Sequence, residues 1–319
     1  MTVRNGLDVN AFLGLDNLTD EARLPIVNGR SWLKIANNID LDDEYMPHRR
    51  MGYSLVLSGD IHSFWSNGSV ALFMQGGILK SMSTAYVAST VLSGLDANAV
   101  MHYVDVNGKI YFTNAVVIGS YESGTASLLS DPGQQFKVTM RPGQLIEYFK
   151  SRLYVAQDNI LWFSDAVNVG SLDMRKNFFQ FSGRITMVNA VEDGLYVSAG
   201  DTTYFLFGKD PFEFVNIEIA GSAAIEGSAH KITSERVGER GMGSAIMWAS
   251  EEGVFLGRPT GSVSNKTWNH YTCDDVQFGS AIVRDDNGFE QYLLAYAIEF
   301  DMSGGDVNIP PLQTSGWME

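Results

Sequence analysis

Short apolar runs separated by turns that carry glycine, asparagine or aspartate recur along the chain, whereas helical periodicity is scarce. The recurring unit has an apolar strand, a tight turn, a strand with an aromatic or branched residue, a second turn and a third strand. The clearest example runs from residues 61–65 through Asn67-Gly68 to residues 70–73, and then through Gly76-Gly77 to Ile78-Leu79. Such runs are typical of antiparallel hairpins, so the pattern predicts an all-β protein.

The first turn of this unit recurs at a nearly regular spacing. It falls at residues 68, 108, 151, 194, 253 and 288, which are 40, 43, 43, 59 and 35 residues apart. A period of about 40 to 50 residues is that of a four-stranded propeller blade, and radial closure protects the sheet edges. We therefore expect a β-propeller of about six four-stranded antiparallel blades. Five or seven blades, or two stacked β-sandwiches, are the alternatives.

The chain shows no clear domain boundary, so we expect one domain. Residues 1–31 are polar and broken by glycine and proline, which predicts an extended N-terminal arm. The propeller would occupy residues 32–300, with an insertion loop at about 221–243, and residues 301–319 would form a C-terminal tail. Because the last repeat is short, we expect a strand from residues 32–57 to pair with the sheet that contains residues 292–300 and so close the ring.

Composition narrows the possible partners. The chain is 45% hydrophobic and 18% charged, and 37 acidic against 22 basic residues give a net charge of −15. Such a chain repels nucleic-acid phosphates, so DNA could pass it without specific binding. Cys273 is the only cysteine, which excludes an intramolecular disulfide and suits folding in a reducing cytoplasm. The sequence has no signal peptide and no apolar run long enough to cross a bilayer, so we expect no membrane partner.

The sequence contains only weak matches to enzymatic motifs. The five histidines lie in different repeats, without metal-binding spacing. The acidic run at residues 40–44 lacks the glycine and the twelfth-position carboxylate of a helix-loop-helix calcium site, so a solvated turn is the better interpretation. Residues 262–268 resemble a sialidase box, but Ser264 replaces its aspartate and the spacing is one residue short. Hydrolase and phosphate-loop motifs are absent. We predict no enzyme, no catalytic or metal residues and no cofactor.

Charged residues near the first repeat are candidates for contacts between copies of the chain. The candidate interface residues are Arg49, Arg50, Asp40, Arg236 and Arg240, the last two in the expected insertion loop. Adjacent arginines on a strand point to opposite faces, so one of Arg49 and Arg50 could meet a neighbour's carboxylate through a two-bond fork. The alternative is an ion pair within the chain, with Asp42 or Asp43.

Two stretches resemble bacteriophage virion proteins. Residues 33–40 contain Ala-Asn-Asn-Ile-Asp, and residues 46–53 contain Arg-Arg-Met-Gly. This order resembles the opening of many phage virion proteins, in which an Ala-x-Asn-hydrophobic-Asp element precedes an Arg-Arg-x-Gly element. Residues 152–212 and 247–271 are similar to uncharacterised phage structural proteins. Tail nozzle and DNA-stabilisation proteins with a propeller body look like this near their N-termini, although they are considerably longer.

The resemblance implies a structural component of a bacteriophage tail or head-to-tail connector. It would form a closed homo-oligomeric ring around the DNA passage and contact the portal, adaptor or fibre proteins. It would be made in the host cytoplasm and reside in the virion tail. The alternative is a carbohydrate-binding or carbohydrate-active propeller of a tail fibre, which a cluster of exposed aromatic and carboxylate side chains would favour.

Overall fold

The computed structural model describes residues 11–36, 39–42, 44–50, 52, 54–166, 168–233, 243–274, 276–286, 289–298 and 314–317. The described part is built from strands, with two short 3-10 turns, η1 (Glu21–Arg23) and η2 (Pro211–Glu213). Among the described residues there is no helix of the length and apolarity needed to cross a membrane. The chain divides into two compact units. Unit 1 is Met1–Gly52, Val191–Asp193 and Glu218–Glu319, and unit 2 is Tyr53–Ala190 and Gly194–Ile217.

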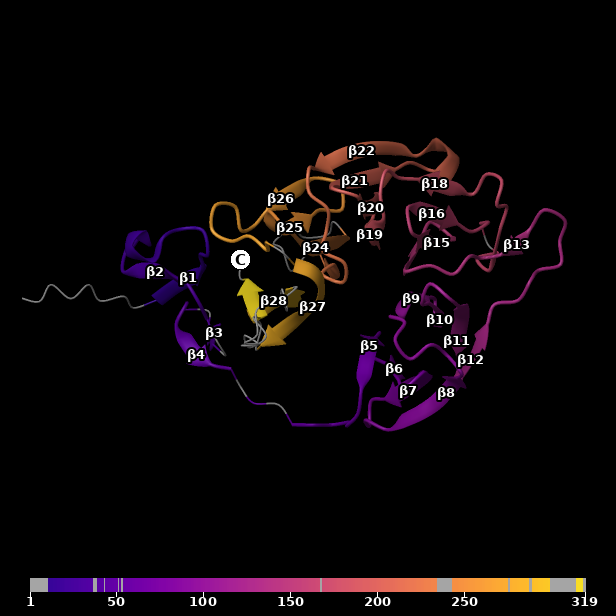
Figure 1. Ribbon diagram of the computed structural model, residues 1–319, viewed down its shortest axis with the longest axis horizontal. Helices are drawn as coiled ribbons and strands as arrows, with labels where there is room; N and C mark the ends of the chain where they lie inside the picture. The colour runs from indigo at the N-terminus through magenta and orange to yellow at the C-terminus, as the bar shows by residue number, and fades with distance from the viewer. Residues whose placement is uncertain are drawn as a thin grey trace, which may run out of the picture. The chain divides into compact units, whose positions relative to one another are not determined.

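Unit 2 is a succession of four antiparallel sheets, each with its strands side by side in chain order (Figure 1). The first sheet is β5 (Ile61–Ser66), β6 (Val70–Gln75), β7 (Ile78–Ser83) and β8 (Ala88–Ser93), and the second is β9 (His102–Val106), β10 (Lys109–Thr113), β11 (Ile118–Glu122) and β12 (Thr125–Leu128). The third is β14 (Leu145–Phe149), β15 (Arg152–Gln157), β16 (Ile160–Phe163) and β18 (Phe178–Gln180), and the fourth is β19 (Ile185–Ala190), β20 (Gly194–Ala199), β21 (Thr202–Phe207) and β22 (Val215–Ala220). A two-stranded pair, β13 (Val138–Thr139) and β17 (Ser171–Leu172), accompanies the third sheet.

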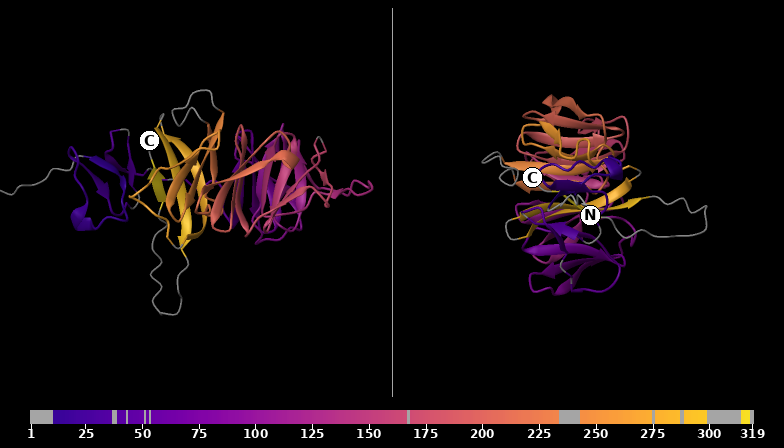
Figure 2. Two further views of the ribbon diagram at one scale, coloured as in Figure 1. Left: turned by 90° about the horizontal axis from the view of Figure 1, so that it is seen from above. Right: turned by 90° about the vertical axis from the view of Figure 1, so that its left-hand side faces the viewer.

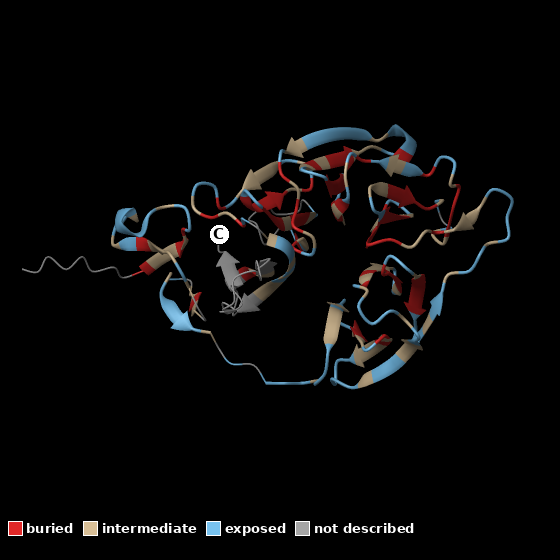
Figure 3. Cartoon of the chain, in the orientation of Figure 1, coloured by how far each residue is buried: buried red, intermediate tan, exposed pale blue. Residues whose placement is uncertain are grey.

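The apolar cores of unit 2 lie between successive sheets, because a middle strand buries both of its faces. On β10, Ile110 and Phe112 join the core shared with the first sheet, whereas Tyr111 joins the core shared with the third. On β15, Leu153 faces the second sheet and Tyr154 faces the fourth. Alternation with a period of two sends neighbouring residues to opposite faces, so these strands are apolar throughout. Figure 3 shows the buried middle strands and the exposed outer strands.

Successive sheets of unit 2 meet along their first strands, since β5 contacts β9, β9 contacts β14 and β14 contacts β19. The strands of unit 2 lie roughly along one axis and alternate in direction (Figure 2, left), so the turns collect at two opposite ends. Sheets stacked face to face around their first strands have the arrangement of propeller blades.

Unit 1 is less regular. It contains a four-stranded sheet of β23 (His230–Thr233), β24 (Ser244–Ser250), β25 (Gly253–Gly257) and β26 (Val263–Asn265), and a three-stranded sheet of β27 (Val276–Asp286), β28 (Phe289–Ile298) and β29 (Thr314–Trp317). β1 (Ala11–Leu15) pairs in parallel with β2 (Arg30–Leu33), and β3 (Ile39–Leu41) pairs with β4 (Pro47–Arg49). Ile225, Val254 and Leu294 belong to one of its core clusters.

The turn spacing located the hairpins correctly but not their place in every sheet. In unit 2 each predicted first turn joins the first and second strands of a sheet. The turn before Gly253 instead joins β24 and β25, which are the second and third strands, because β23 precedes them. The 59-residue interval therefore contains an additional first strand inside the expected insertion loop. The last predicted turn, at residues 287 and 288, lies outside the described residues.

Two expectations about the chain ends need correction. Among the described strands, β28 pairs with β27 and with β29 from the expected tail, so the prediction that residues 32–57 supply the third strand was wrong. The N-terminal segment meets this sheet through side chains instead, through Asp40 with Arg284 and the Gln291 amide with the Leu41 carbonyl. Residues 11–31, expected as an extended arm, form β1, η1 and the start of β2, because Asp16 and Asp20 accept backbone N–H groups and stabilise the turns.

Candidate functional site

Two of the predicted interface residues form an ion pair inside unit 1. Asp40 is buried on β3, where Oδ1 lies 2.7 Å from Nη2 of Arg50 and Oδ2 lies 2.8 Å from Nη2 of Arg284. Burial alone would raise the pKa of Asp40, but the hydrogen bonds from the two guanidinium groups outweigh it, so the pKa lies below its usual range. Asp40 is therefore inaccessible to a neighbouring copy, and Arg50 follows the intrachain alternative, with Asp40 in place of Asp42 or Asp43.

The remaining predicted interface residues differ in their outcome. Arg49 is exposed at the end of β4, where its role between copies stays a prediction. Arg236 and Arg240 lie outside the described residues. Asp42 accepts the backbone N–H groups of Glu44 and Met46, so a turn forms there as expected, but Asp40, at the start of the acidic run, is buried on β3 and does not lie in a solvated turn.

Sequence reasoning missed a second polar contact in unit 1, between His270 and the N-terminal segment. Nδ1 of His270 lies 3.1 Å from Oδ2 of the buried Asp16, and its ring stacks on Trp32 with 3.9 Å between centroids. Asn17 exchanges two hydrogen bonds with the backbone of Thr272. These groups are about 250 positions apart in the sequence, so no local sequence motif predicts that they are in contact. Together they fasten residues 11–34 to the loop after β26.

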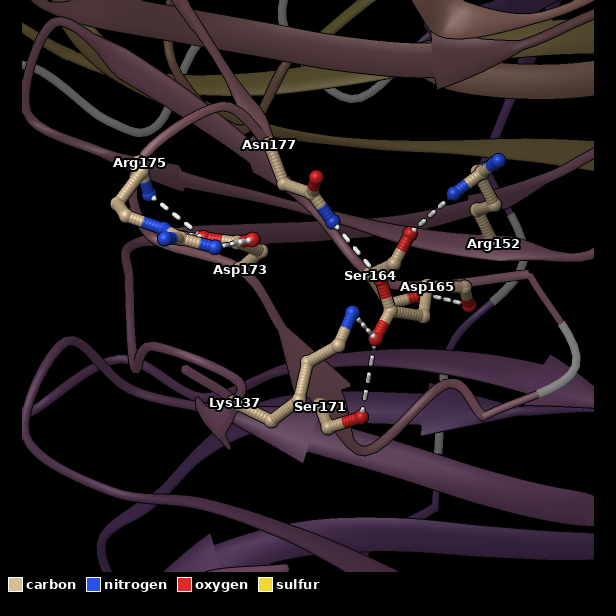
Figure 4. Close-up of polar contacts among 8 residues, drawn as sticks. All are labelled: Lys137, Arg152, Ser164, Asp165, Ser171, Asp173, Arg175 and Asn177. Atoms are coloured by element: carbon tan, nitrogen blue, oxygen red, sulfur yellow. Dashed lines mark hydrogen bonds and ion pairs between the residues drawn. The ribbon is translucent and has the colours of Figure 1, made fainter. Parts of the chain in front are cut away.

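The richest polar network of unit 2 lies at one end of its third sheet (Figure 4). Because β16 and β18 are antiparallel, the loop between them returns to the same end as the turn between β14 and β15. The loop after β21 meets this end too, since Lys150 Nζ donates to the Gly208 carbonyl and Arg152 Nη2 lies 3.0 Å from Asp210. We call this region, residues 130–137, 150–152, 164–177 and 208–214, the basic loop end.

Asp165 is the centre of the network. Its carboxylate accepts hydrogen bonds from Lys137 Nζ at 2.5 Å and from Asn177 Nδ2 at 3.1 Å, and Ser171 Oγ lies 3.5 Å away (Figure 4). Ser164 just before it accepts the Leu153 N–H at its Oγ. The sequence Leu-Trp-Phe-Ser-Asp at residues 161–165 therefore ends a core strand and fixes the loop that follows it.

Arg175 and Lys176 lie between two exposed aromatic rings. Arg175 binds Asp173 through Nε at 2.9 Å and Nη2 at 2.6 Å, and these bonds hold the pKa of Asp173 well below its usual range. The guanidinium also lies 4.2 Å from the ring centroid of Phe136, and Lys176 Nζ lies 5.6 Å from that of Phe212. Both rings are more than half exposed. We call these four residues, Phe136, Arg175, Lys176 and Phe212, the aromatic–cation patch.

The patch differs in charge from most of the molecule. Unit 1 has 12 basic and 25 acidic residues, a net charge of −13, whereas unit 2 has 10 and 12, a net charge of −2. Residues 137–184 contain seven basic residues and four acidic ones. Asp165 is paired with Lys137 and Asp173 with Arg175, and the loops carry further exposed cations, Lys150, Lys176 and Lys209.

The described residues contain no group of three or more histidine, cysteine, aspartate or glutamate side chains that could hold a metal ion. Cys273 is buried, and burial raises the pKa of its thiol to about 12. An exposed arginine beside an aromatic ring is suited to recognising carboxylates and other anions.

Comparisons with known proteins bear on the fold alone. No protein-family model matches the chain, and no curated protein sequence matches it. The extracellular domain of the putative one-component system BT4673 from B. thetaiotaomicron is 15% identical with a TM-score of 0.51, over 88% of this chain and 34% of that one. PorZ, a surface component of the type-IX secretion system of Porphyromonas gingivalis, is 11% identical with a TM-score of 0.50, over 89% and 36%. The chain thus spans about a third of the length of these two proteins.

The WD40 β-propeller domain of Doa1 is also similar, at 11% identity and a TM-score of 0.47 over 80% of this chain and 84% of that one. The stacked four-stranded antiparallel sheets, together with the likeness to solved structures, confirm the predicted class. The chain is an all-β protein of the β-propeller type.

Proposed function

We propose that the chain is a structural, non-catalytic propeller of a bacteriophage tail or head-to-tail connector, assembled as a closed ring of copies around the DNA passage. The sequence support is the resemblance of residues 33–53, 152–212 and 247–271 to phage virion proteins. The structural observation that carries the proposal is the contrast between a strongly acidic unit 1 and the basic loop end of unit 2.

This contrast suits ring assembly for a geometric reason. A ring of identical copies needs a head-to-tail contact in which two different patches of the same chain meet. Patches of opposite charge attract one another and disfavour the self-pairing of either patch. The net charge of −15 would repel the phosphates of a passing genome, so DNA could move through without being held.

The proposed partners are further copies and the neighbouring portal, adaptor or fibre proteins. Arg49 is exposed and so accessible to a neighbour. The segment at residues 221–243 is the second proposed contact, since it interrupts the regular spacing of the repeats.

The experiment that tests this function is to purify the particles from infected cells and to identify their proteins by mass spectrometry. A tagged copy of the chain should then be located by electron microscopy. We expect a ring of copies at the tail or its junction with the head. A chain that is abundant in infected cells and absent from purified particles would refute the proposal.

The second candidate is a carbohydrate-binding propeller of a tail fibre, and one observation favours it. Trp268, at the end of the stretch that resembles a sialidase box, is 65% exposed, and sugar rings stack on exposed aromatic side chains. Binding to host surface glycans that is lost in Trp268→Ala, together with a position on the fibres, would support this candidate over the ring.

A further inference from the structure

We infer that the aromatic–cation patch is the surface on which a second copy of this chain docks, through exposed carboxylates of that copy's unit 1. The inference rests on the proposed ring and specifies its contact. It names the surface on unit 2, the chemistry of the partner and the side chains that recognise it.

The geometry of the patch favours recognition over internal packing. Phe136 has a φ of 64°, a left-handed conformation that is costly for a bulky residue, and it is 60% exposed. Its ring lies 4.2 Å from the Arg175 guanidinium and remains exposed. Phe212 is anchored edge-on to Phe163 at 5.3 Å, so its exposed face has a fixed position. Two fixed rings flanking two adjacent cations form a pre-organised surface.

Arg175 retains capacity for a further partner. Asp173 accepts hydrogen bonds from Nε and Nη2 of this arginine, and the side chain is still 62% exposed. The Nη1 edge of the guanidinium can therefore donate to a second carboxylate, which is the geometry that arginine provides and lysine does not.

The local charge defines the partner as an anion. Across the basic loop end the exposed cations are Lys150, Arg175, Lys176 and Lys209. The exposed carboxylates of the same described loops are Asp131 and Glu213, and the side chain of Asp210, which pairs with Arg152, is 43% exposed. Asp165 is paired with Lys137, and Asp173 with Arg175 (Figure 4).

A second copy of the chain carries charge that complements this surface. Unit 1 has a net charge of −13, and its exposed carboxylates include Glu21, Glu44, Glu251 and Glu252. Copies of the chain therefore supply the complementary charge themselves. Nucleic-acid phosphates carry the same sign of charge as these carboxylates, and the anisotropy measurement below separates the two partners.

The test compares the full-length chain with the double variant Arg175→Glu, Lys176→Glu by sedimentation velocity over a range of concentrations, at low and high salt. We expect the wild type to associate, more weakly at high salt, and the variant to lose about tenfold or more in its association constant. The control is Lys80→Glu, Lys109→Glu, which changes the net charge by the same amount on the first two sheets. We expect the control to associate as the wild type does, and circular dichroism should show all three proteins folded.

Three outcomes would overturn the inference: a wild type that stays monomeric at every concentration, an equal loss in the control, and an unchanged double variant. Fluorescence anisotropy with a short DNA duplex provides a fourth. Wild-type binding that the Arg175→Glu, Lys176→Glu variant loses would identify nucleic acid as the partner instead. The proposed function fails separately, since a chain that associates through the patch but is absent from particles refutes only the virion role.

Discussion

Unit 1 and unit 2 differ in the kind of contact that stabilises each of them internally. In unit 2, four sheets follow one another, and three apolar cores lie between them, built from strands that bury both faces. In unit 1, the N-terminal segment instead meets distant strands and loops through buried carboxylates. Asp40 binds Arg284, and Asp16 binds His270.

The unit with the regular sequence repeat is stabilised by apolar layers, and the less regular unit depends on specific buried ion pairs. Repeated apolar layers tolerate substitutions that keep volume and alternation, since each layer resembles the next. A buried carboxylate with two cationic partners depends on every partner, because removing one leaves a charge without compensation. The two units should therefore respond differently to mutation and to pH.

The largest effect should come from Asp40→Ala, which leaves Arg50 and Arg284 without the carboxylate that they share. We expect the free energy of unfolding of unit 1 to fall by about 3 kcal/mol, the magnitude typical of a broken buried ion pair. Hydrogen exchange should increase in β3, β27 and β28, while the four sheets of unit 2 keep their protection. Glu122→Ala is the control, because both side chains of its pair with Lys109 are exposed to solvent, so its effect should be far smaller. Equal losses for the two variants would contradict the contrast.

Acidification should destabilise the two units in different pH ranges. In unit 2, burial and, to a smaller extent, the charge of Arg184 together lower the pKa of His102 from 6.5 to about 4. Below pH 6.5 the unfolded chain binds a proton that the folded chain does not, so unit 2 should lose on the order of 2 kcal/mol of stability as the pH falls toward 4. In unit 1, Asp16 and Asp40 have lowered pKa values, so their contribution persists above the usual carboxylate range and disappears as the pH falls through those values.

Hydrogen exchange at a series of pH values, resolved by peptide, would measure this order. His102→Gln should remove the loss in unit 2 between pH 6.5 and 4 and leave the acid response of unit 1 unchanged. A wild type whose unit 1 opens first on acidification would contradict the assignment.

Much of unit 2 could be predicted from the sequence, and less of unit 1. Each first turn in unit 2 lies in a local hairpin, and local pairing follows from alternation and turn residues. In unit 1, β23 pairs with β24, and β29 pairs with β28. These pairings depend on which sheet edge is free in three dimensions, and the local sequence does not contain that information. The Arg50–Asp40 pair could have been predicted from the sequence, because the residues are ten positions apart and an intrachain pair was one of the two alternatives.

The aromatic–cation patch and the His270 contact could not be predicted from the sequence, and the physical reason is the same for both. Phe136, Arg175 and Phe212 belong to three separate loops, which come together only because antiparallel strands return to one end of the sheets. The sequence does hold one signal, the excess of basic residues between positions 137 and 184 in an otherwise acidic chain. Charge density along the sequence could therefore have located the region, but not the residues that meet there.

A smaller effect is expected from His270→Ala, which removes the stacking on Trp32 and one hydrogen-bonding group of Asp16. We expect unit 1 to lose about 1 kcal/mol, because the contact is partly exposed to solvent. Limited proteolysis should cleave the variant within residues 11–34 faster than the wild type. His48→Ala, an exposed residue on β4, is the control and should leave the cleavage rate unchanged. Equal rates for His270→Ala and wild type would show that other contacts hold this segment.

The smallest effect on stability should come from Phe136→Asn, and this variant separates packing from recognition. Phe136 has a left-handed backbone conformation, which asparagine adopts more readily, so the substitution relieves backbone strain. The substitution also removes the contact between the Phe136 ring and Arg175, which costs stability. These two effects oppose each other, so we expect the free energy of unfolding to stay within about 0.5 kcal/mol of the wild type. Self-association should nevertheless weaken severalfold, because one of the two rings of the patch is gone.

Phe64→Asn is the control, since both phenylalanines are 60% exposed and both lie in unit 2. Phe64 differs in having an ordinary φ and in lying in the first sheet. Sedimentation velocity and urea unfolding of both variants should show weaker association only for Phe136→Asn. The same loss in both would mean that the association of this chain depends on exposed apolar area and not on this patch.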